Sequence, residues 1–300
     1  GTTITVGTTA PWSNSGTMRA TAGTLNLGGN FSTSGLGTVQ AAGGTVNISG
    51  TLNNTGATLA LNPSTGSWNL AGGTITGGTI AATGGAGLAV TYGSMIGVTI
   101  AAATPVTVGS NSTLTVGGGL TLNGTLTVAS TSPYGWAAVY FNGTQTLSGS
   151  GQVVFGGSYS NNSVFVQGGG TPFTGATLTI GPGVLVHGTM GGNITAATPY
   201  DTFVNQGTID ADTSNVTLFV TSTLPWTNTG TLAASNGGHL QLNSALNTNG
   251  AGCLLSTTPG LAISPIAKRN SAPSKPASWP AWRRSSASSS GITTSEAWSM

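Results

Sequence analysis

Three aspartates are the residues of the first 260 whose type and spacing could support hydrolytic chemistry. Cleavage of a glycosidic bond needs two carboxyl groups at a defined separation. Asp210 and Asp212 stand two positions apart, so their side chains would share one face of an extended strand, and Asp201 is the third candidate. The ordinary interpretation of such a pair is a solvated surface feature, and a weak calcium site at Asp210 and Asp212 is an alternative hypothesis.

Bases that could work with these acids are scarce in the sequence. His187 and His239 have no Ser or Asp motif directly beside them, and Arg19 is the one Lys or Arg of the first 260 residues. A polysaccharide lyase would need such a base close to the acids. The calcium-binding glycine-aspartate nonapeptide and Cys/His clusters are also absent from the sequence. We therefore predict that the chain is not an enzyme and needs no cofactor.

Aromatic residues concentrate between positions 133 and 173 and offer a different chemistry, because aromatic rings can stack on sugar rings. Tyr134, Trp136 and Tyr140 are the candidate glycan-binding residues. In a strand, alternation would place Trp136 on one side and Val139 with Phe141 on the other. The default expectation is that the aromatic group fills the core of wider turns, since aromatic side chains are mostly buried.

Threonines in Thr-x-Thr pairs raise a third hypothesis, because regular threonine arrays resemble the surface of ice-binding β-helices. β-Propensity alone also explains outward threonines, and the pairs do not recur at a constant interval. The pairs are Thr3/Thr5, Thr74/Thr76, Thr113/Thr115, Thr125/Thr127 and Thr177/Thr179.

A repeated phrase shows which elements must position all these residues. Gly23–Leu27 reads Gly-Thr-Leu-Asn-Leu, and it returns as Gly44–Ile48 and Gly66–Leu70 at intervals of 21 and 22 residues. A fixed period near 20 residues indicates a repeat architecture. A second phrase, Gly16–Ala20, returns as Gly37–Ala41, and Asp210 would occupy the outward slot of Arg19 and Gln40.

Apolar and polar residues alternate within each phrase, which is the pattern of a half-buried strand. Short strands with a constant register of about 21 residues predict a coil in which each strand pairs with its counterpart one turn later. We therefore expect an all-β, right-handed parallel β-solenoid of about 20–21 residues per turn and on the order of 12 turns. Leu25, Val46 and Trp68 would form one inward column, and the asparagines that follow them, Asn26, Asn47 and Asn69, an outward one.

A corner motif accompanies the strands. The heptad Pro11–Thr17 returns as Pro225–Thr231, and Phe203–Ile209 is a close variant. Each contains Asn-x-Gly-Thr, and both Asn and Gly tolerate left-handed backbone, so a corner of the coil is predicted there.

Charge divides the chain at about residue 260. Residues 1–260 carry a net charge of −2 and residues 261–300 one of +4, so the body offers no basic footprint for nucleic acid. We predict a β-helix body over 1–260 and an irregular Ser/Pro/Lys/Arg-containing tail over 261–300. No apolar run is long enough to cross a bilayer, no secretory signal is recognised, and the single Cys253 excludes an internal disulfide.

These repeats resemble the passenger domains of bacterial autotransporters and filamentous-haemagglutinin-like surface proteins. The resemblance covers roughly residues 1–255 and rests on Asn-x-Gly-Thr followed by Gly-Thr-Leu-Asn-Leu. It implies a secreted right-handed β-helix that acts as an adhesin, a biofilm component or a cell-surface stalk.

The expected function is therefore an extracellular structural or adhesive rod at the bacterial cell surface. No cap is evident at Gly1, which favours end-to-end assembly into a filament or matrix. The expected partners are further copies, other surface proteins or glycans, without nucleic acid or membrane insertion. A carbohydrate-active β-helix and an ice-binding protein are the alternative functions.

Overall fold

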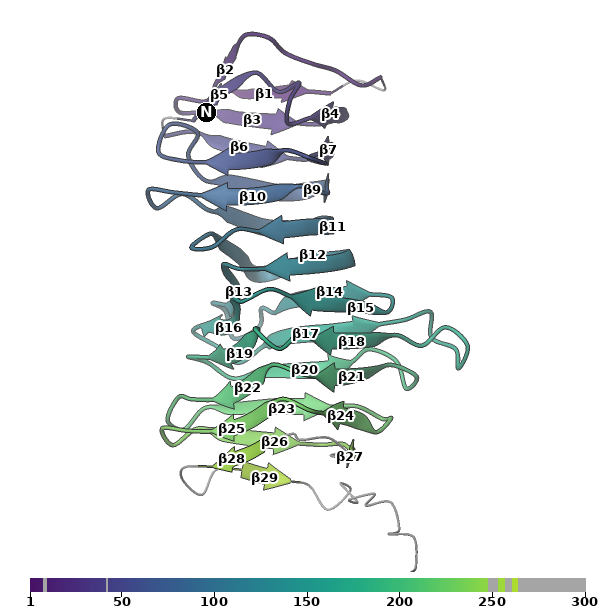
Figure 1. Ribbon diagram of the computed structural model, residues 1–300. Coiled ribbons are helices and arrows are strands. Elements are labelled where there is room, and N and C mark those ends of the chain that lie inside the picture. Colours follow the sequence, from purple (N-terminus) through teal and green to yellow (C-terminus); the bar gives the residue numbers. More distant parts are fainter. Residues whose placement is uncertain (8–9, 42, 248–252, 257–260, 264–300) are drawn as a thin grey trace, which may run out of the picture. The chain divides into compact units, whose positions relative to one another are not determined.

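The computed structural model describes residues 1–7, 10–41, 43–247, 253–256 and 261–263, and these are all-β with no helix. They belong to one compact unit, Gly1–Asn270. Its strands stack in layers from β1 to β29 and make a parallel β-solenoid of about 11 turns, which confirms the predicted fold class (Figure 1). The predicted tail lies outside the described residues except for β29. No described helix could span a membrane.

Parallel pairing divides the strands into three walls. Wall 1 contains β1 (Thr3–Val6), β3 (Thr24–Leu27), β6 (Thr45–Ile48), β13 (Thr125–Ser130), β16 (Gln152–Gly157), β19 (Leu185–Gly188), β22 (Thr208–Ala211), β25 (Thr231–Ala234) and β28 (Cys253–Ser256). Wall 2 contains β4 (Asn30–Ser32), β7 (Thr51–Asn53), β14 (Ala137–Asn142), β17 (Asn162–Gln167), β20 (Gly192–Ala196), β23 (Thr217–Thr221), β26 (His239–Leu242) and β29 (Leu261–Ile263).

Wall 3 completes the turns from β8 onward. It contains β8 (Thr58–Leu61), β10 (Thr79–Ala82), β15 (Gln145–Ser148), β18 (Thr177–Ile180), β21 (Thr202–Asn205), β24 (Trp226–Asn228) and β27 (Leu246–Asn247). Three longer strands bend around corners: β9 (Trp68–Thr76) serves walls 1 and 2, while β11 (Leu88–Ile100) and β12 (Pro105–Leu122) serve all three. Two early strands, β2 (Thr17–Arg19) and β5 (Thr38–Gln40), pair only with each other among the described residues.

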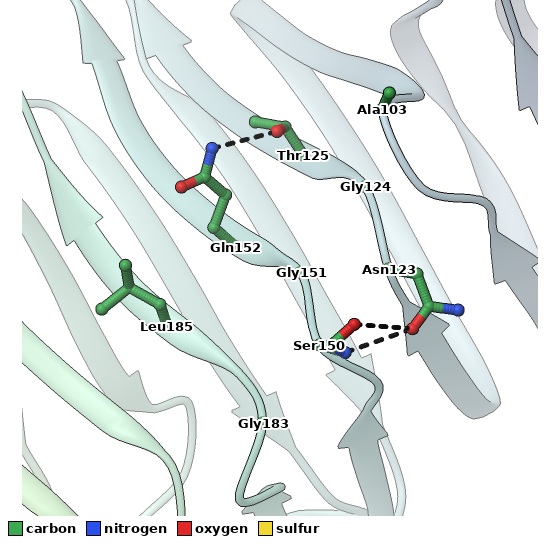
Figure 2. A pocket seen from close by; sticks show the side chains of 9 residues that line it. All are labelled: Ala103, Asn123, Gly124, Thr125, Ser150, Gly151, Gln152, Gly183 and Leu185. Atoms are coloured by element: carbon green, nitrogen blue, oxygen red, sulfur yellow. Dashed lines mark hydrogen bonds between the residues drawn. The ribbon is translucent and has the colours of Figure 1, made fainter.

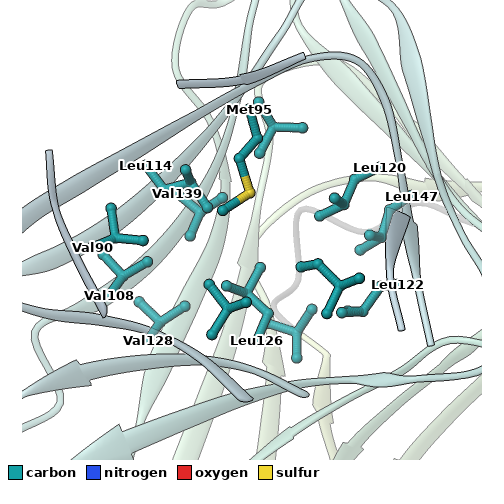
Figure 3. Close-up of a cluster of buried hydrophobic side chains, with 14 of the residues drawn as sticks. Val90, Met95, Val108, Leu114, Leu120, Leu122, Leu126, Val128, Val139 and Leu147 are labelled. Atoms are coloured by element: carbon teal, nitrogen blue, oxygen red, sulfur yellow. The ribbon is translucent and has the colours of Figure 1, made fainter. Parts of the chain in front are cut away.

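The predicted inward column is present. Leu25 pairs in register with Val46, and Val46 pairs with Trp68, and all three side chains are buried. The same inward stacking continues through the middle turns, where Val90, Val108 and Val128 line up along one side of the interior and Leu120, Leu122 and Leu147 along another (Figure 3). Burial of these apolar columns, at about 25 cal/mol per Å², is the main stabilising term of the fold.

The predicted outward column is a hydrogen-bonded ladder of amides. Asn47 Nδ2 donates to Asn26 Oδ1 at 2.8 Å, and Asn69 Nδ2 donates to Asn47 Oδ1 at 3.2 Å. The ladder continues at both ends, to Thr5 through Asn26 and to Thr91 through Asn69. Repeating one amide at one register thus gives every member a partner in the next turn.

We expect Asn47→Ala to destabilise the solenoid by about 1 kcal/mol, because it removes two ladder hydrogen bonds at a half-exposed position where water replaces part of the loss. Urea denaturation followed by circular dichroism measures the change. Thr107→Ala, at an exposed position of the same wall, is the control. An Asn47→Ala chain as stable as the control would show that the ladder contributes nothing.

The asparagines of the corner motif act through their side chains and do not use the left-handed backbone that Asn tolerates. None of Asn14, Asn205 and Asn228 has a positive φ angle. Their Nδ2 groups instead donate to the carbonyl two residues ahead, at 3.0 Å, 3.3 Å and 3.1 Å. Asn205 and Asn228 are buried and also bond to each other at 2.7 Å.

Two glycines of the same motif, Gly207 and Gly230, are required by close approach between turns. A Cβ atom at Gly230 would lie 2.1 Å from the carbonyl oxygen of Gly207, and one at Gly207 would lie 2.4 Å from that of Val184. Both distances are far inside van der Waals contact. In the two later copies the Asn-x-Gly spacing therefore pairs a buried amide, of Asn205 or Asn228, with a backbone that must touch its neighbour.

Turn size explains why about 11 turns form where about 12 were expected. Thr24 pairs with Thr45, 21 residues away, but Thr125 pairs with Gln152 and Gln152 with Leu185, which are 27 and 33 residues apart. The additional residues form longer loops between the walls, including 131–136, which contains Tyr134 and Trp136, and 168–175, which contains Phe173.

Candidate functional site

The aromatic segment divides between core and surface. Val139 and Phe141 are fully buried, as alternation predicts. Tyr134 is 95% exposed and Trp136 is 46% exposed, so the expectation that they fill wider turns is wrong for both. The extra residues of this larger turn form the projecting loop 131–136, so these rings lie outside the stacked interior.

Hydrogen bonds from the next turn hold this loop. Asn161 Nδ2 donates to the carbonyl oxygens of Pro133 and Gly135 at 3.1 Å and 2.9 Å. Ser130 Oγ donates to Gly135 O at 3.1 Å, and the backbone of Ser130 forms a bridge with Tyr159, a partly exposed aromatic residue of the following turn. The exposed rings therefore project from a fixed loop.

Tyr140 faces outward on wall 2, but its ring already has a partner. Tyr140 pairs in register with Phe165, and the two rings stack with centroids 4.5 Å apart and planes 9° from parallel. One face of Tyr140 is therefore covered by protein. Its hydroxyl group and its ring edge remain for contact with a ligand.

Tyr92 is a further outward ring on the same wall, and it was not among the candidates. It is 59% exposed and pairs in register with Thr113, which in turn pairs with Ala138. Its ring lies against Gly72, where a Cβ atom would sit 2.8 Å from the ring. A register shift between Val90 and Tyr92 turns the side chain outward.

We call the outward surface of wall 2 from β11 to β17 the aromatic face. Its rings are Tyr92, Tyr140 and Phe165, with Trp136 on the loop that leads directly into β14, and its small residues are Ser94, Thr113, Thr115 and Ser163. None of these positions carries a charge. The surface therefore combines aromatic carbon with hydroxyl groups and has no ionic component.

The acidic candidates lie on a different wall. Asp210 is on wall 1 in β22, and Asp212 follows that strand, with both side chains partly exposed. Arg19 and Gln40 belong to the separate β2–β5 sheet, so the prediction that Asp210 shares their slot is wrong, although its outward direction is correct.

His187 lies beside these acids, contrary to the expectation from sequence. Its Nδ1 atom is 2.8 Å from Asp212 Oδ2, and its Nε2 atom is 3.0 Å from Gln152 Oε1. Gln152 Nε2 donates onward to Thr125 Oγ1 at 3.1 Å. Because the partners belong to four successive turns, their neighbourhood is invisible in the sequence. His239 is exposed on wall 2.

The polar side chains in this part of wall 1 form a group that we call the polar row: Thr125, Gln152, His187, Asp210, Asp212 and Ser235. Its chemistry is limited because its polar atoms bond to one another. Both imidazole nitrogens of His187 already contact a side-chain oxygen, one of Asp212 and one of Gln152. Ser235 Oγ contacts the two carboxylate oxygens of Asp210, at 3.1 Å each, and no bond joins it to His187. The row is not a Ser-His-Asp arrangement, in which the histidine must reach the serine.

Asp210 gives the row a dependence on pH. Partial burial raises the pKa of Asp210, the Ser235 hydrogen bond lowers it, Asp212 raises it and His187 lowers it, with a net rise above the ordinary 3.8. The folded chain therefore binds this proton more tightly than the unfolded chain. At a pH above the raised pKa of Asp210, the ionised carboxylate opposes folding, and this penalty fades as the pH falls through that pKa.

We expect Asp210→Asn to stabilise the chain slightly at neutral pH, by about 0.5 kcal/mol or less as for most surface changes. The amide oxygen can still accept the Ser235 hydrogen bond. Thermal melts at a series of pH values, from neutral to acid, measure the difference in stability between Asp210→Asn and the natural chain. This difference should shrink as the pH falls toward the ordinary aspartate pKa. A difference that grows on acidification would contradict the assignment.

A shallow polar groove of about 230 Å³ adjoins the row on wall 1. Figure 2 shows the Gln152 amide bonded to Thr125 and the Ser150 side chain bonded to Asn123, with Leu185 on the next strand. The glycines Gly124, Gly151 and Gly183 line the rest. The groove contains no aromatic or charged side chain among these residues.

The geometry gives little support to the metal-binding and ice-binding hypotheses. No group of three or more His, Cys, Asp or Glu able to hold a metal occurs in the described part of the chain, and the calcium site at Asp210 and Asp212 stays a prediction. The Thr-x-Thr pairs are distributed over walls 1, 2 and 3, and no two of them are neighbours in register. They do not form one flat array.

Asp201 has a structural position. It is fully buried, and its carboxylate accepts hydrogen bonds from the backbone N–H groups of Ala176 and Thr198 at 2.8 Å and 2.9 Å. It therefore fixes the loop that leads into wall 3.

Comparison with known proteins gives one structural similarity. No protein-family model matches the chain, and no curated protein matches it. The chain is similar to the crystal structure of a TibC-catalysed hyper-glycosylated TibA fragment, with 19% identity, 87% of this chain and 97% of that chain covered, and a TM-score of 0.31. A similarity at this level assigns no function to the chain.

Proposed function

We propose that this chain is a non-catalytic structural or adhesive solenoid that works outside the cell, at a bacterial surface. The observation that carries the proposal is the combination of one continuous stack of parallel turns with an outer surface of hydroxyls, amides and exposed aromatic rings. Such a solenoid presents extended surfaces built from repeated positions. The resemblance of its repeats to autotransporter passenger and filamentous-haemagglutinin-like proteins supports the location.

Two features support a role in contact rather than catalysis. His187 contacts Asp212 and Gln152, and Ser235 bonds to Asp210 and not to His187, so the polar row holds no Ser-His pair that would activate a nucleophile. The low charge leaves little self-repulsion to oppose association with further copies or with other surface proteins.

Protease treatment of intact cells tests the location. Cells that produce the natural protein are treated with a protease that cannot cross the membrane, and the released peptides are identified by mass spectrometry. Peptides from residues 1–247 should be released while a cytoplasmic marker protein stays intact. Release only after cell lysis would contradict an extracellular role.

The runner-up function is a carbohydrate-active enzyme, favoured by the acids and the groove on wall 1. Incubation with neutral and acidic polysaccharides, followed by measurement of reducing ends, distinguishes it. Turnover that disappears in Asp212→Asn would replace the proposed role with a catalytic one.

A further inference from the structure

The aromatic face has a regular geometry that follows from the solenoid. Neighbouring strands of a sheet lie about 4.8 Å apart, so Tyr92 on β11 and Trp136 beside β14, two turns further, are separated by about 10 Å along the solenoid axis. Trp136 directly precedes Ala137, which pairs with Ser112, and this places it about two residues, or roughly 7 Å, to the side of Tyr92. The turn spacing is close to the length of one pyranose residue in an extended polysaccharide.

The residues between the rings supply hydrogen-bonding groups. Thr113 is in register with Tyr92, and Thr115 is in register with Tyr140. Hydroxyl groups both donate and accept hydrogen bonds, as sugar hydroxyls do. Ala138, in register with Thr113, is only 2% exposed, so its neighbours cover it and it offers no surface to a ligand.

The charge of the face decides which ligands fit. No Asp, Glu, Lys or Arg lies among its residues, and the acids of the described chain lie in or next to β21 and β22. An anionic polymer would find no cation there, and a cationic one no carboxylate. An uncharged ligand with flat apolar ring faces and a rim of hydroxyls is the chemistry that this surface complements.

We propose that the aromatic face binds an uncharged, extended polysaccharide that lies along the solenoid axis. Its pyranose rings contact Tyr92 and Trp136, and its hydroxyl groups bond to Thr113, Thr115 and the Tyr140 hydroxyl. Tyr134, on the fixed loop beside Trp136, extends the contact at one end. This proposal rests on the proposed adhesive role and gives it a class of partner.

Rigidity of the site supports binding, because little order has to be created when the ligand arrives. The rings of Tyr140 and Phe165 hold each other, the loop of Trp136 is held by Asn161, and Tyr92 rests against Gly72. Each contact is fixed within the protein before any ligand is present.

The test uses the full chain and four probes: microcrystalline cellulose, chitin, soluble xyloglucan and the anionic polygalacturonate. Sedimentation with the insoluble probes and affinity electrophoresis with the soluble ones measure binding. We expect retention by at least one neutral probe, unchanged by added salt, and no retention by polygalacturonate. Trp136→Ala and Tyr92→Ala should each weaken binding about tenfold.

Phe173→Ala is the matched control, because Phe173 is 98% exposed but lies on the loop 168–175 outside the aromatic face. Its binding should equal that of the natural chain, and circular dichroism verifies that each variant is folded. Absence of binding to all three neutral probes, salt-sensitive binding to polygalacturonate, or equal losses in Trp136→Ala and Phe173→Ala would overturn the proposal. The release of peptides from intact cells by protease would be unaffected by that failure. The proposed polysaccharide ligand and the proposed surface location can therefore be contradicted independently.

Discussion

Replacement of Trp68 by alanine is expected to lower the free energy of unfolding by about 3–5 kcal/mol, the usual cost of removing a large buried aromatic side chain. Trp68 is 2% exposed, stands between Val46 and Leu88 in the inward column of wall 1, and donates from Nε1 to Thr65 O at 3.0 Å. Its loss would leave a cavity between turns that the closely stacked backbone cannot collapse to fill.

Urea denaturation followed by far-ultraviolet circular dichroism measures this loss, and hydrogen exchange locates it. Since each turn contacts only its neighbours, protection should fall first in peptides that cover the adjacent turns. The matched control is Trp136→Ala, which removes the same side chain from the surface and should cost about 0.5 kcal/mol or less. Equal losses for the two variants would contradict the inward position of Trp68.

Replacement of Asp201 by alanine is expected to cost about 3 kcal/mol. Two backbone N–H groups, of Ala176 and Thr198, would lose a charged acceptor in a site closed to water. A hydrogen bond to a charged group contributes about 1.5–3 kcal/mol, and an unpaired buried donor carries its own penalty. Exchange at Ala176 and Thr198 should accelerate.

Two variants separate this effect from loss of negative charge. Asp201→Asn keeps one acceptor oxygen and turns an N–H₂ group toward the other donor, so an intermediate loss is expected. Asp212→Ala removes a partly exposed carboxylate and one bond to His187, and a smaller loss is expected. An Asp201→Ala chain as stable as Asp212→Ala would mean that the buried carboxylate does not hold the loop.

Repetition made the fold predictable. The phrase around Leu25, Val46 and Trp68 determines both the inward column and the amide ladder of Asn26, Asn47 and Asn69, because one residue pattern recurs in three successive turns. The Asn-x-Gly-Thr motif predicted the place of the corners, but the buried contacts of Asn205 and Asn228 depend on a neighbouring turn. Pattern alone could not supply that detail.

The surface sites were less predictable, and the reasons are physical. Simple alternation from Leu88 and Val90 would turn Tyr92 inward, but a local register shift reverses it. His187 and Asp212 meet across neighbouring turns of unequal length, so their spacing of 25 residues carries no recognisable motif. Tyr134 and Trp136 were identified as candidates from their type, whereas their exposure results from the enlarged turn.

Disulfide trapping between successive turns tests the central claim, that like positions lie above one another once per turn. In a Cys253→Ser background, cysteines replace Asn26 and Asn47, whose Cα atoms are neighbours in register at about 4.8 Å, within reach of a disulfide. Mild oxidation should close this pair within one chain. A second pair, at Asn26 and Ile48, is one residue out of register with side chains on opposite faces, and it should stay reduced. Equal trapping of both pairs, or trapping of the second alone, would contradict the stacked solenoid.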